Sequence, residues 1–137
     1  MKNFPKIKEI NITPIAIVDP PLLNAAGLHA PYALRIIVEL ITDDNITGIS
    51  EIPGTTDIEI ALHECKNLII GQDPFQTNKI SDILIAHFGI DKMAERGLFP
   101  WDSRKLVHIF SAIEVACLDI VGKVINKPVV DLLGGKR

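Results

Sequence analysis

Histidine is a versatile side chain for binding and proton transfer, and one of the four histidines in this sequence stands apart from the others. His29 lies between Gly27 and Pro31 in a stretch, residues 19–32, that contains three prolines and follows no helix or strand periodicity. Loops of this length in compact domains are usually functional or disordered, and loops on rigid scaffolds often carry binding groups. A histidine here could donate a hydrogen bond to a carboxylate or hydroxyl group near neutral pH. We therefore predict that His29 contacts a ligand; the alternative is that it caps a local turn.

The other histidines and the acidic residues of the long C-terminal helical pattern favour structural roles. His63, His87 and His108 fall on helical patterns, where single histidines usually lack an orienting partner. Glu114 and Asp119 are five positions apart, so they do not stack on one helix face. A catalytic acid–base pair is one interpretation. Hydrogen bonds or ion pairs at a packing seam are the favoured one, because buried carboxylates are almost always paired.

Composition excludes several classes of function. The net charge of −3 leaves no basic excess to neutralise phosphates, which argues against a nucleic-acid partner. No apolar run approaches the ~20 residues of a membrane helix, and the N-terminus lacks the apolar core of a signal peptide. Cys65 and Cys117 fall on apolar helix positions without a CxxC motif, which favours free buried thiols in a cytoplasmic protein. A disulfide or a metal pair is the alternative.

Three strands are predicted in the first part of the chain. Residues 7–18 are rich in β-branched side chains, and Pro14 within them indicates an edge strand or a bulge. Residues 34–42 alternate between an apolar face and a mixed face, and residues 46–52 return after a turn. The predicted result is an antiparallel meander of three strands, with long or proline-containing loops at 19–32 and 53–54.

Helices are predicted to follow the strands. Thr56 and Glu59 fit a capping box that opens a helix ended by Gly71. Asp73 and Pro74 are a suitable N-cap and first residue for a second helical stretch. Strands first and helices afterwards predict an α+β fold, with a three-stranded sheet beside a helical bundle, in a single domain that spans residues 1–137.

The third helical pattern should be the central element of the fold. An irregular segment, residues 90–102, holds the only tryptophan, and the helix that follows it is ended by Pro128. Apolar residues occur nearly all round this helix, which predicts burial on several sides. The apolar stripe recurs every three or four residues, at Val107, Phe110, Ile113, Cys117, Ile120 and Val124.

Residues 112–135 carry a resemblance to a known family. They read A-I-E-V-A-C-L-D-I-V-G-K, then P-V and L-L-G-G. This order of motifs resembles the end of the N-terminal domain in the mandelate racemase and muconate-lactonising branch of the enolase superfamily. The resemblance implies that the whole chain is the capping domain that covers a catalytic barrel in those enzymes.

The sequence around His29 is most similar to that of the glucarate dehydratases. Residues 24–31 (N-A-A-G-L-H-A-P), 51–54 (E-I-P-G) and 96–104 (R-G-L-F-P-W-D-S-R) match motifs of that subgroup in the same order. The resemblance implies substrate contact by His29, and less strongly by Asn24, Tyr32 and Pro100. Pro100 stands at a position where the family uses a threonine, and Ser50 replaces the usual glycine before Glu51.

The catalytic part of such an enzyme is not expected in this chain. The resemblance implies Mg²⁺-dependent proton abstraction next to a carboxylate, followed by loss of water, with bases and metal ligands on a (β/α)₈ barrel. A barrel needs about 200 residues or more. We therefore expect no catalytic residue and no metal ligand here, no activity of the chain alone, and binding of a hexarate-type substrate only together with a barrel. The partner is expected to be a barrel or a second copy of the chain. The alternative function is a freestanding interaction or oligomerisation module.

Overall fold

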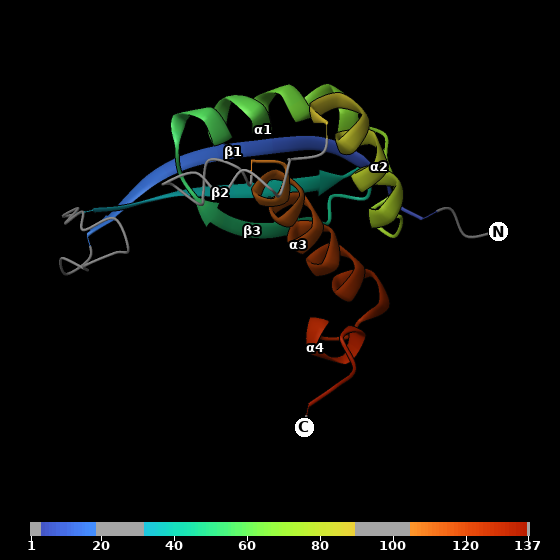
Figure 1. Cartoon of the computed structure of the whole chain (residues 1–137). Helices are drawn as coiled ribbons and strands as arrows, with labels where there is room; N and C mark the ends of the chain where they lie inside the picture. The colour runs from blue at the N-terminus through green and yellow to red at the C-terminus, as the bar shows by residue number, and fades with distance from the viewer. Residues whose placement is uncertain (1–3, 19–31, 90–104, 137) are drawn as a thin grey trace.

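The computed structural model describes residues 4–18, 32–89 and 105–136. Within these ranges a three-stranded antiparallel sheet is followed by helices, which confirms the predicted α+β fold (Figure 1). The strands are adjacent in chain order, β1 to β2 to β3, so the sheet is a meander. The elements are β1 (Ile7–Val18), β2 (Tyr32–Thr42), β3 (Thr47–Pro53), α1 (Thr56–Ile69), α2 (Thr77–Phe88), α3 (Lys105–Ile125) and the short α4 (Val129–Leu132).

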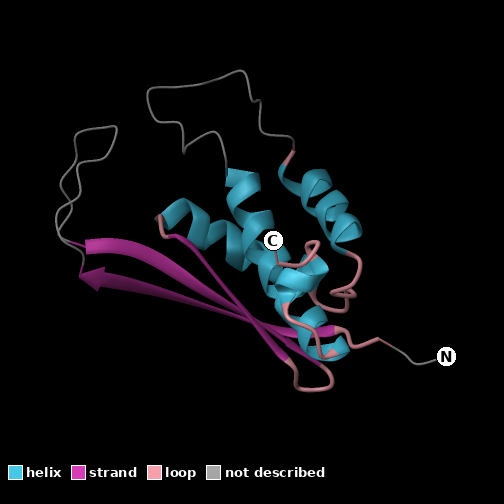
Figure 2. Ribbon diagram, turned by 90° about the horizontal axis from the view of Figure 1, so that it is seen from below, coloured by secondary structure: helices cyan, strands magenta, loops and turns pink. Residues whose placement is uncertain are grey.

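The two faces of the sheet differ as the sequence alternation predicts. Ile36, Val38 and Leu40 of β2 are fully buried, whereas the residues between them are only half-buried. Successive side chains of a strand point to opposite faces, so one face forms the core and the other does not. Figure 2 shows the helices gathered on one side of the sheet. We call the face with the buried residues the inner face.

Pro14 lies on an edge strand, as predicted. Within the described ranges β1 pairs only with β2, so no described strand lies along its other edge, and a residue without an N–H is tolerated there. The irregularity of the pairing register lies elsewhere, between Ile7 and Glu9. Near it, the backbone N–H of Ile7 donates to the carbonyl of Gln72, which ties the start of β1 to the α1–α2 connection.

α3 is buried over most of its length, as predicted, and Ile113, Cys117 and Ile120 of the predicted apolar stripe are fully buried, but other members of the stripe are not. Val107 is 57% exposed, whereas Ile109, Ala112 and Ala116 are fully buried. The buried face is centred on the residues that approach β3, where Gly48 lies against the Ala116 backbone and the Ile120 side chain, so it is offset from the predicted stripe.

Two predicted helix starts are wrong. At α1 the structure has Thr55 as N-cap without a side-chain cap to the backbone, and the Thr55 hydroxyl donates to the Asp57 carboxylate instead. At α2 the helix begins at Thr77, not at Pro74. The Asp73 carboxylate accepts from the Phe75 N–H at 3.0 Å, and this tight turn uses the capping group before the helix begins.

Candidate functional site at the loop end of the sheet

Two of the segments with possible function leave the sheet at the same end. Val18, the last residue of β1, pairs with Tyr32, the first residue of β2. β3 ends at Pro53, which pairs with Arg35 near the start of β2. The chain after β1 and the chain after β3 therefore depart from neighbouring positions. We call this part of the molecule the loop end.

The direction of α3 places its first residues at the loop end as well. The Ser50 hydroxyl donates to the Ala112 carbonyl at 2.6 Å, and the Ile49 N–H donates to the Asp119 carboxylate at 3.0 Å. The Lys123 ammonium reaches the Thr47 carbonyl, at 2.6 Å. Residue numbers thus fall along β3 while they rise along α3. The start of α3 must consequently lie where β3 finishes.

The electrostatics of Asp57 agree with this placement. The pKa of the Asp57 carboxyl is lowered, chiefly by the hydrogen bond from the Thr55 hydroxyl and to a smaller degree by the Lys105 charge. Asp57 lies in the first turn of α1 and Lys105 is the first residue of α3. The first turns of the two helices are therefore close enough for their charges to interact, which agrees with a start of α3 at the loop end.

Only one of the four predicted substrate contacts falls within the described residues. Tyr32 is 52% exposed and lies at the loop end, on β2 rather than in the preceding loop where the sequence placed it. The antiparallel pairing with β1 continues two residues further than predicted, which turns Tyr32 into a strand residue. His29, Asn24 and Pro100 lie outside the described residues, so their predicted roles stay predictions.

The structure adds an ion pair and a close backbone contact that sequence reasoning did not assign. The Arg35 guanidinium donates through Nε to the Glu51 carboxylate. Next to this pair, the Gly54 N–H donates to the Leu34 carbonyl at 2.8 Å, and a Cβ on Gly54 would lie 3.0 Å from the Arg35 backbone. The two strands are thereby joined at the loop end. The sequence shows both charged residues, but their contact depends on the strand register, which periodicity does not fix.

The loop end has a shallow groove on the inner face of the sheet. Its volume is about 300 Å³, and it lies between the β1–β2 ribbon and the first turn of α1. The described residues contain no group of three or more His, Cys, Asp or Glu side chains that could hold a metal ion. The groove is mainly apolar and is lined by Pro14, Ile15, Ala16, Leu34, Arg35, Ile36, Gly54, Thr55, Thr56 and Glu59.

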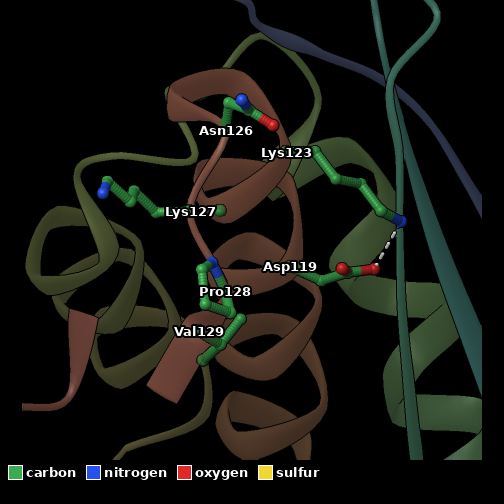
Figure 3. A pocket seen from close by; sticks show the side chains of 7 residues that line it. Asp119, Lys123, Asn126, Lys127, Pro128 and Val129 are labelled. Carbon is green, nitrogen blue, oxygen red and sulfur yellow. Dashed lines mark hydrogen bonds and ion pairs between the residues drawn. The ribbon is translucent and has the colours of Figure 1, made fainter. Parts of the chain in front are cut away.

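A second hollow, of about 320 Å³, lies at the opposite end of α3 (Figure 3). It contains two lysines, but the Lys123 ammonium already donates to the Asp119 carboxylate at 2.7 Å. Lys127 projects away from Lys123 rather than toward it (Figure 3). The two cations do not converge on one point, and they sit at the negative end of the helix dipole. For Asp119, the contacts agree with the favoured interpretation of a hydrogen bond and ion pair at a packing seam.

Comparison with known proteins places this domain in a defined family. The sequence profile described as "Mandelate racemase / muconate lactonizing enzyme, N-terminal domain" matches residues 21–134. The chain belongs to this family of N-terminal domains, within the enolase superfamily.

Individual relatives narrow the comparison. A probable glucarate dehydratase of Streptomyces coelicolor is 37% identical over 95% of this chain and 32% of its own length. An enolase of Pseudomonas fluorescens with bound magnesium, potassium and tartrate is 38% identical, with a TM-score of 0.82 over 97% of this chain and 32% of that one. An enolase of Mycobacterium smegmatis complexed with tartrate is 38% identical, with a TM-score of 0.84 over 98% of this chain and 31% of that one. The chain thus spans about a third of the length of these relatives.

No helix in the described part of the chain is both long enough and apolar enough to cross a membrane.

Proposed function

We propose that this chain is the substrate-capping and specificity domain of a glucarate dehydratase-like hydro-lyase. The observation that carries the proposal is that the end of β1, the end of β3 and the start of α3 lie together at the loop end, in a domain of the mandelate racemase and muconate lactonizing enzyme family. Loops at one end of a rigid scaffold are suited to cover a substrate and to exclude water from it.

The substrate class rests on the relatives. One of them is a probable glucarate dehydratase, and two enolase structures similar to this chain hold tartrate, a small hydroxy dicarboxylate. A hexarate such as D-glucarate carries the same groups: two terminal carboxylates with hydroxyl groups between them. We propose His29 as a hydrogen-bond donor to such a substrate, with weaker contributions from Asn24 and Tyr32 and a backbone contact at Pro100 in place of a hydroxyl.

In this proposal the catalytic residues lie on a barrel, and this chain covers them. Magnesium is present in the Pseudomonas fluorescens structure, of which this chain covers 32%. We assign the Mg²⁺ ligands and the bases that abstract the proton to a barrel in the part of such an enzyme that this chain does not cover, and the capping surface to this chain. The chain alone should not turn over substrate.

A chimaera tests the proposal. The N-terminal third of the Streptomyces coelicolor relative is replaced by this chain, and dehydration of D-glucarate is measured with Mg²⁺ present. We expect activity in the chimaera and none in the chain alone. His29→Ala should lower kcat/KM by roughly 100-fold, the scale of losing a substrate-positioning contact.

The matched control is His63→Ala, which removes an exposed histidine on α1 and should leave kcat/KM unchanged. Turnover by the isolated chain, or equal kinetics of the His29→Ala and His63→Ala chimaeras, would contradict the proposal.

A further inference from the structure

α3 carries a second stripe of residues on the side that does not face the sheet. Members of this stripe are alternately four and three positions apart, so they share one face of the helix. Val107 and Ile125 at its two ends are 57% and 42% exposed, and the members between them are half-buried. The fully buried Ile109 and Ala116 lie on the opposite face. We call this set the outward stripe; it consists of Val107, Ser111, Glu114, Leu118, Val121 and Ile125.

Glu114 is the one charged member of the outward stripe and lies in its middle. The sequence predicts a hydrogen bond or an ion pair for Glu114 and for Asp119, at a packing seam. Asp119 has both, whereas Glu114 makes neither with any residue of the described ranges. A half-buried carboxylate between apolar side chains is costly unless a donor or a cation meets it. The seam predicted for Glu114 is therefore not one between the described elements of this chain.

The position of Glu114 disfavours a second copy of the chain as the partner. If two copies packed their outward stripes antiparallel with full overlap, the two-fold axis would pass near Ala116, halfway between the two ends of the stripe. Each Glu114 would lie two residues from this axis, so the two carboxylates would be roughly 6 Å apart along the helices. Each copy also has a net charge of −3. A second copy can thus use this face only against the repulsion of like charges.

We propose that the outward stripe is an interface for a partner that places a cationic side chain, arginine or lysine, against Glu114. Arginine is enriched in the cores of protein interfaces, where a desolvated carboxylate needs a charged donor. The partner that we infer is the barrel of the proposed enzyme, because this chain spans only about a third of the length of its relatives. The choice of a barrel rests on the proposed function, whereas the requirement for a cation rests on Glu114 itself.

Self-association of the isolated chain gives the first test. Glu114→Gln keeps the size of the side chain and removes its charge, so the repulsion between two copies disappears. We expect the apparent dissociation constant, measured by sedimentation velocity, to fall by roughly tenfold, between the limits for two charges about 6 Å apart in water and in a protein interior. The matched control is Glu9→Gln, which changes the net charge equally at an exposed residue of β1 and should leave the constant unchanged.

The chimaera with the barrel of the Streptomyces coelicolor relative gives the second test, and the expected effect has the opposite sign. There Glu114→Gln leaves the cation of the barrel without its counter-charge, which destabilises the contact. The midpoint of thermal unfolding should fall by roughly 2–4 °C. The same substitution should not lower the midpoint of the isolated chain, and Glu9→Gln should leave both midpoints unchanged.

Unchanged or weaker self-association of the isolated Glu114→Gln chain would overturn the proposal, because a second copy would then satisfy the carboxylate. A midpoint that Glu114→Gln lowers no more in the chimaera than in the isolated chain would also overturn it. Neither test measures turnover, so the two proposals fail separately. A folded chimaera that does not dehydrate D-glucarate, but is destabilised by Glu114→Gln, would reject the proposed reaction and support the interface.

Discussion

Gly48 and Ser50 decide how closely β3 approaches α3. A Cβ on Gly48 would lie 2.0 Å from the carbonyl oxygen of Ala116, a distance that real side chains do not show. One turn earlier on the helix, the buried Ser50 hydroxyl donates to the Ala112 carbonyl. Gly48, which has no side chain, and the small polar Ser50 thus lie against the backbone carbonyls of Ala116 and Ala112. This contact fixes the height of α3 along β3, and with it the position of the start of α3 at the loop end.

Gly48→Ala should destabilise the domain, because the obstructing atom is helix backbone and cannot move aside cheaply. Overpacking of this kind costs about 1–3 kcal/mol. Urea denaturation should show a lower midpoint with an unchanged slope. Ile49→Ala, at the neighbouring half-exposed position, serves as control and should shift the midpoint less. A Gly48→Ala midpoint equal to that of the wild-type chain would contradict the close contact.

The buried thiols predict a loss of stability in alkaline solution. Burial, with a smaller effect of a neighbouring glutamate, raises the pKa of both Cys65 and Cys117 to about 12 from an ordinary value of 9.0. The folded chain therefore keeps both protons where the unfolded chain loses them. The stabilisation that the two thiols add to the free energy of unfolding is complete below about pH 9. It falls as pH rises toward 12, by at most ~1.4 kcal/mol per pH unit for each thiol.

The free energy of unfolding, measured in urea at about pH 8 and about pH 10, gives the alkaline slope. The Cys65→Ala, Cys117→Ala double variant should be less stable at both values but show a smaller difference between them. Equal slopes in the variant and the wild-type chain would show that other groups cause the alkaline loss.

At the scale of elements, α3 protects the outer edge of β3. The Ile49 N–H and the Thr47 carbonyl point away from β2, and the side chains of Asp119 and Lys123 satisfy them at 3.0 Å and 2.6 Å. The two side chains also pair with each other, one helical turn apart. An unpaired edge is a site for unwanted strand addition, so this pair acts as an edge guard as well as a link between elements.

Asp119→Ala should cost about 1–2 kcal/mol, less than a fully buried charged hydrogen bond because the side chain is 27% exposed. Hydrogen exchange provides the specific readout: the Ile49 amide should exchange faster in the variant. Asp44→Ala, in the exposed turn between β2 and β3, is the control and should leave that amide protected. Unchanged protection of Ile49 in Asp119→Ala would argue against the link.

The sequence predicted the elements better than their junctions. The alternation in β2 and the edge position of Pro14 follow from the strand period and from the missing N–H of proline, both local properties. The predicted start of α2 is wrong because the Asp73 side chain caps a turn before the helix. Asp73 also pairs with Lys6 at 3.1 Å, and this contact between distant parts of the chain cannot be seen in a local pattern. The Arg35–Glu51 pair likewise depends on strand register. The motifs around His29 predict a functional segment, but only the strand pairing and the packing of α3 show that the ends of β1 and β3 and the start of α3 meet at the loop end.

At the scale of the whole molecule, an antiparallel arrangement explains why function is expected at one end. β2 starts where β1 and β3 finish, and α3 runs against β3. Every segment that the sequence marks as irregular therefore departs from or returns to the loop end, while the opposite end holds the β2–β3 turn and the end of α3. Substitutions near the second hollow should consequently affect stability more than ligand contact.

The exposed side of α3 and the C-terminal segment predict self-association of the isolated chain. Val107 and Val115 on α3 are 57% and 47% exposed, and Leu133 beyond α4 is 71% exposed. Apolar side chains this exposed on one helix and its extension favour burial against another surface. In the proposed enzyme that surface would be a barrel; in its absence, a second copy is the available one. Sedimentation velocity of the chain alone should show a mass that rises with concentration.

Val107→Lys together with Leu133→Lys should lower this association, because two desolvated charges oppose burial of the face. The control is Ile60→Lys on α1, which changes the net charge in the same direction at a residue 53% exposed on a different helix. In the chimaera with a barrel, the unmodified domain should lose its concentration dependence, since the barrel then covers the same face. If the chimaera associates as strongly as the isolated chain, the face is an interface between copies and the barrel binds elsewhere.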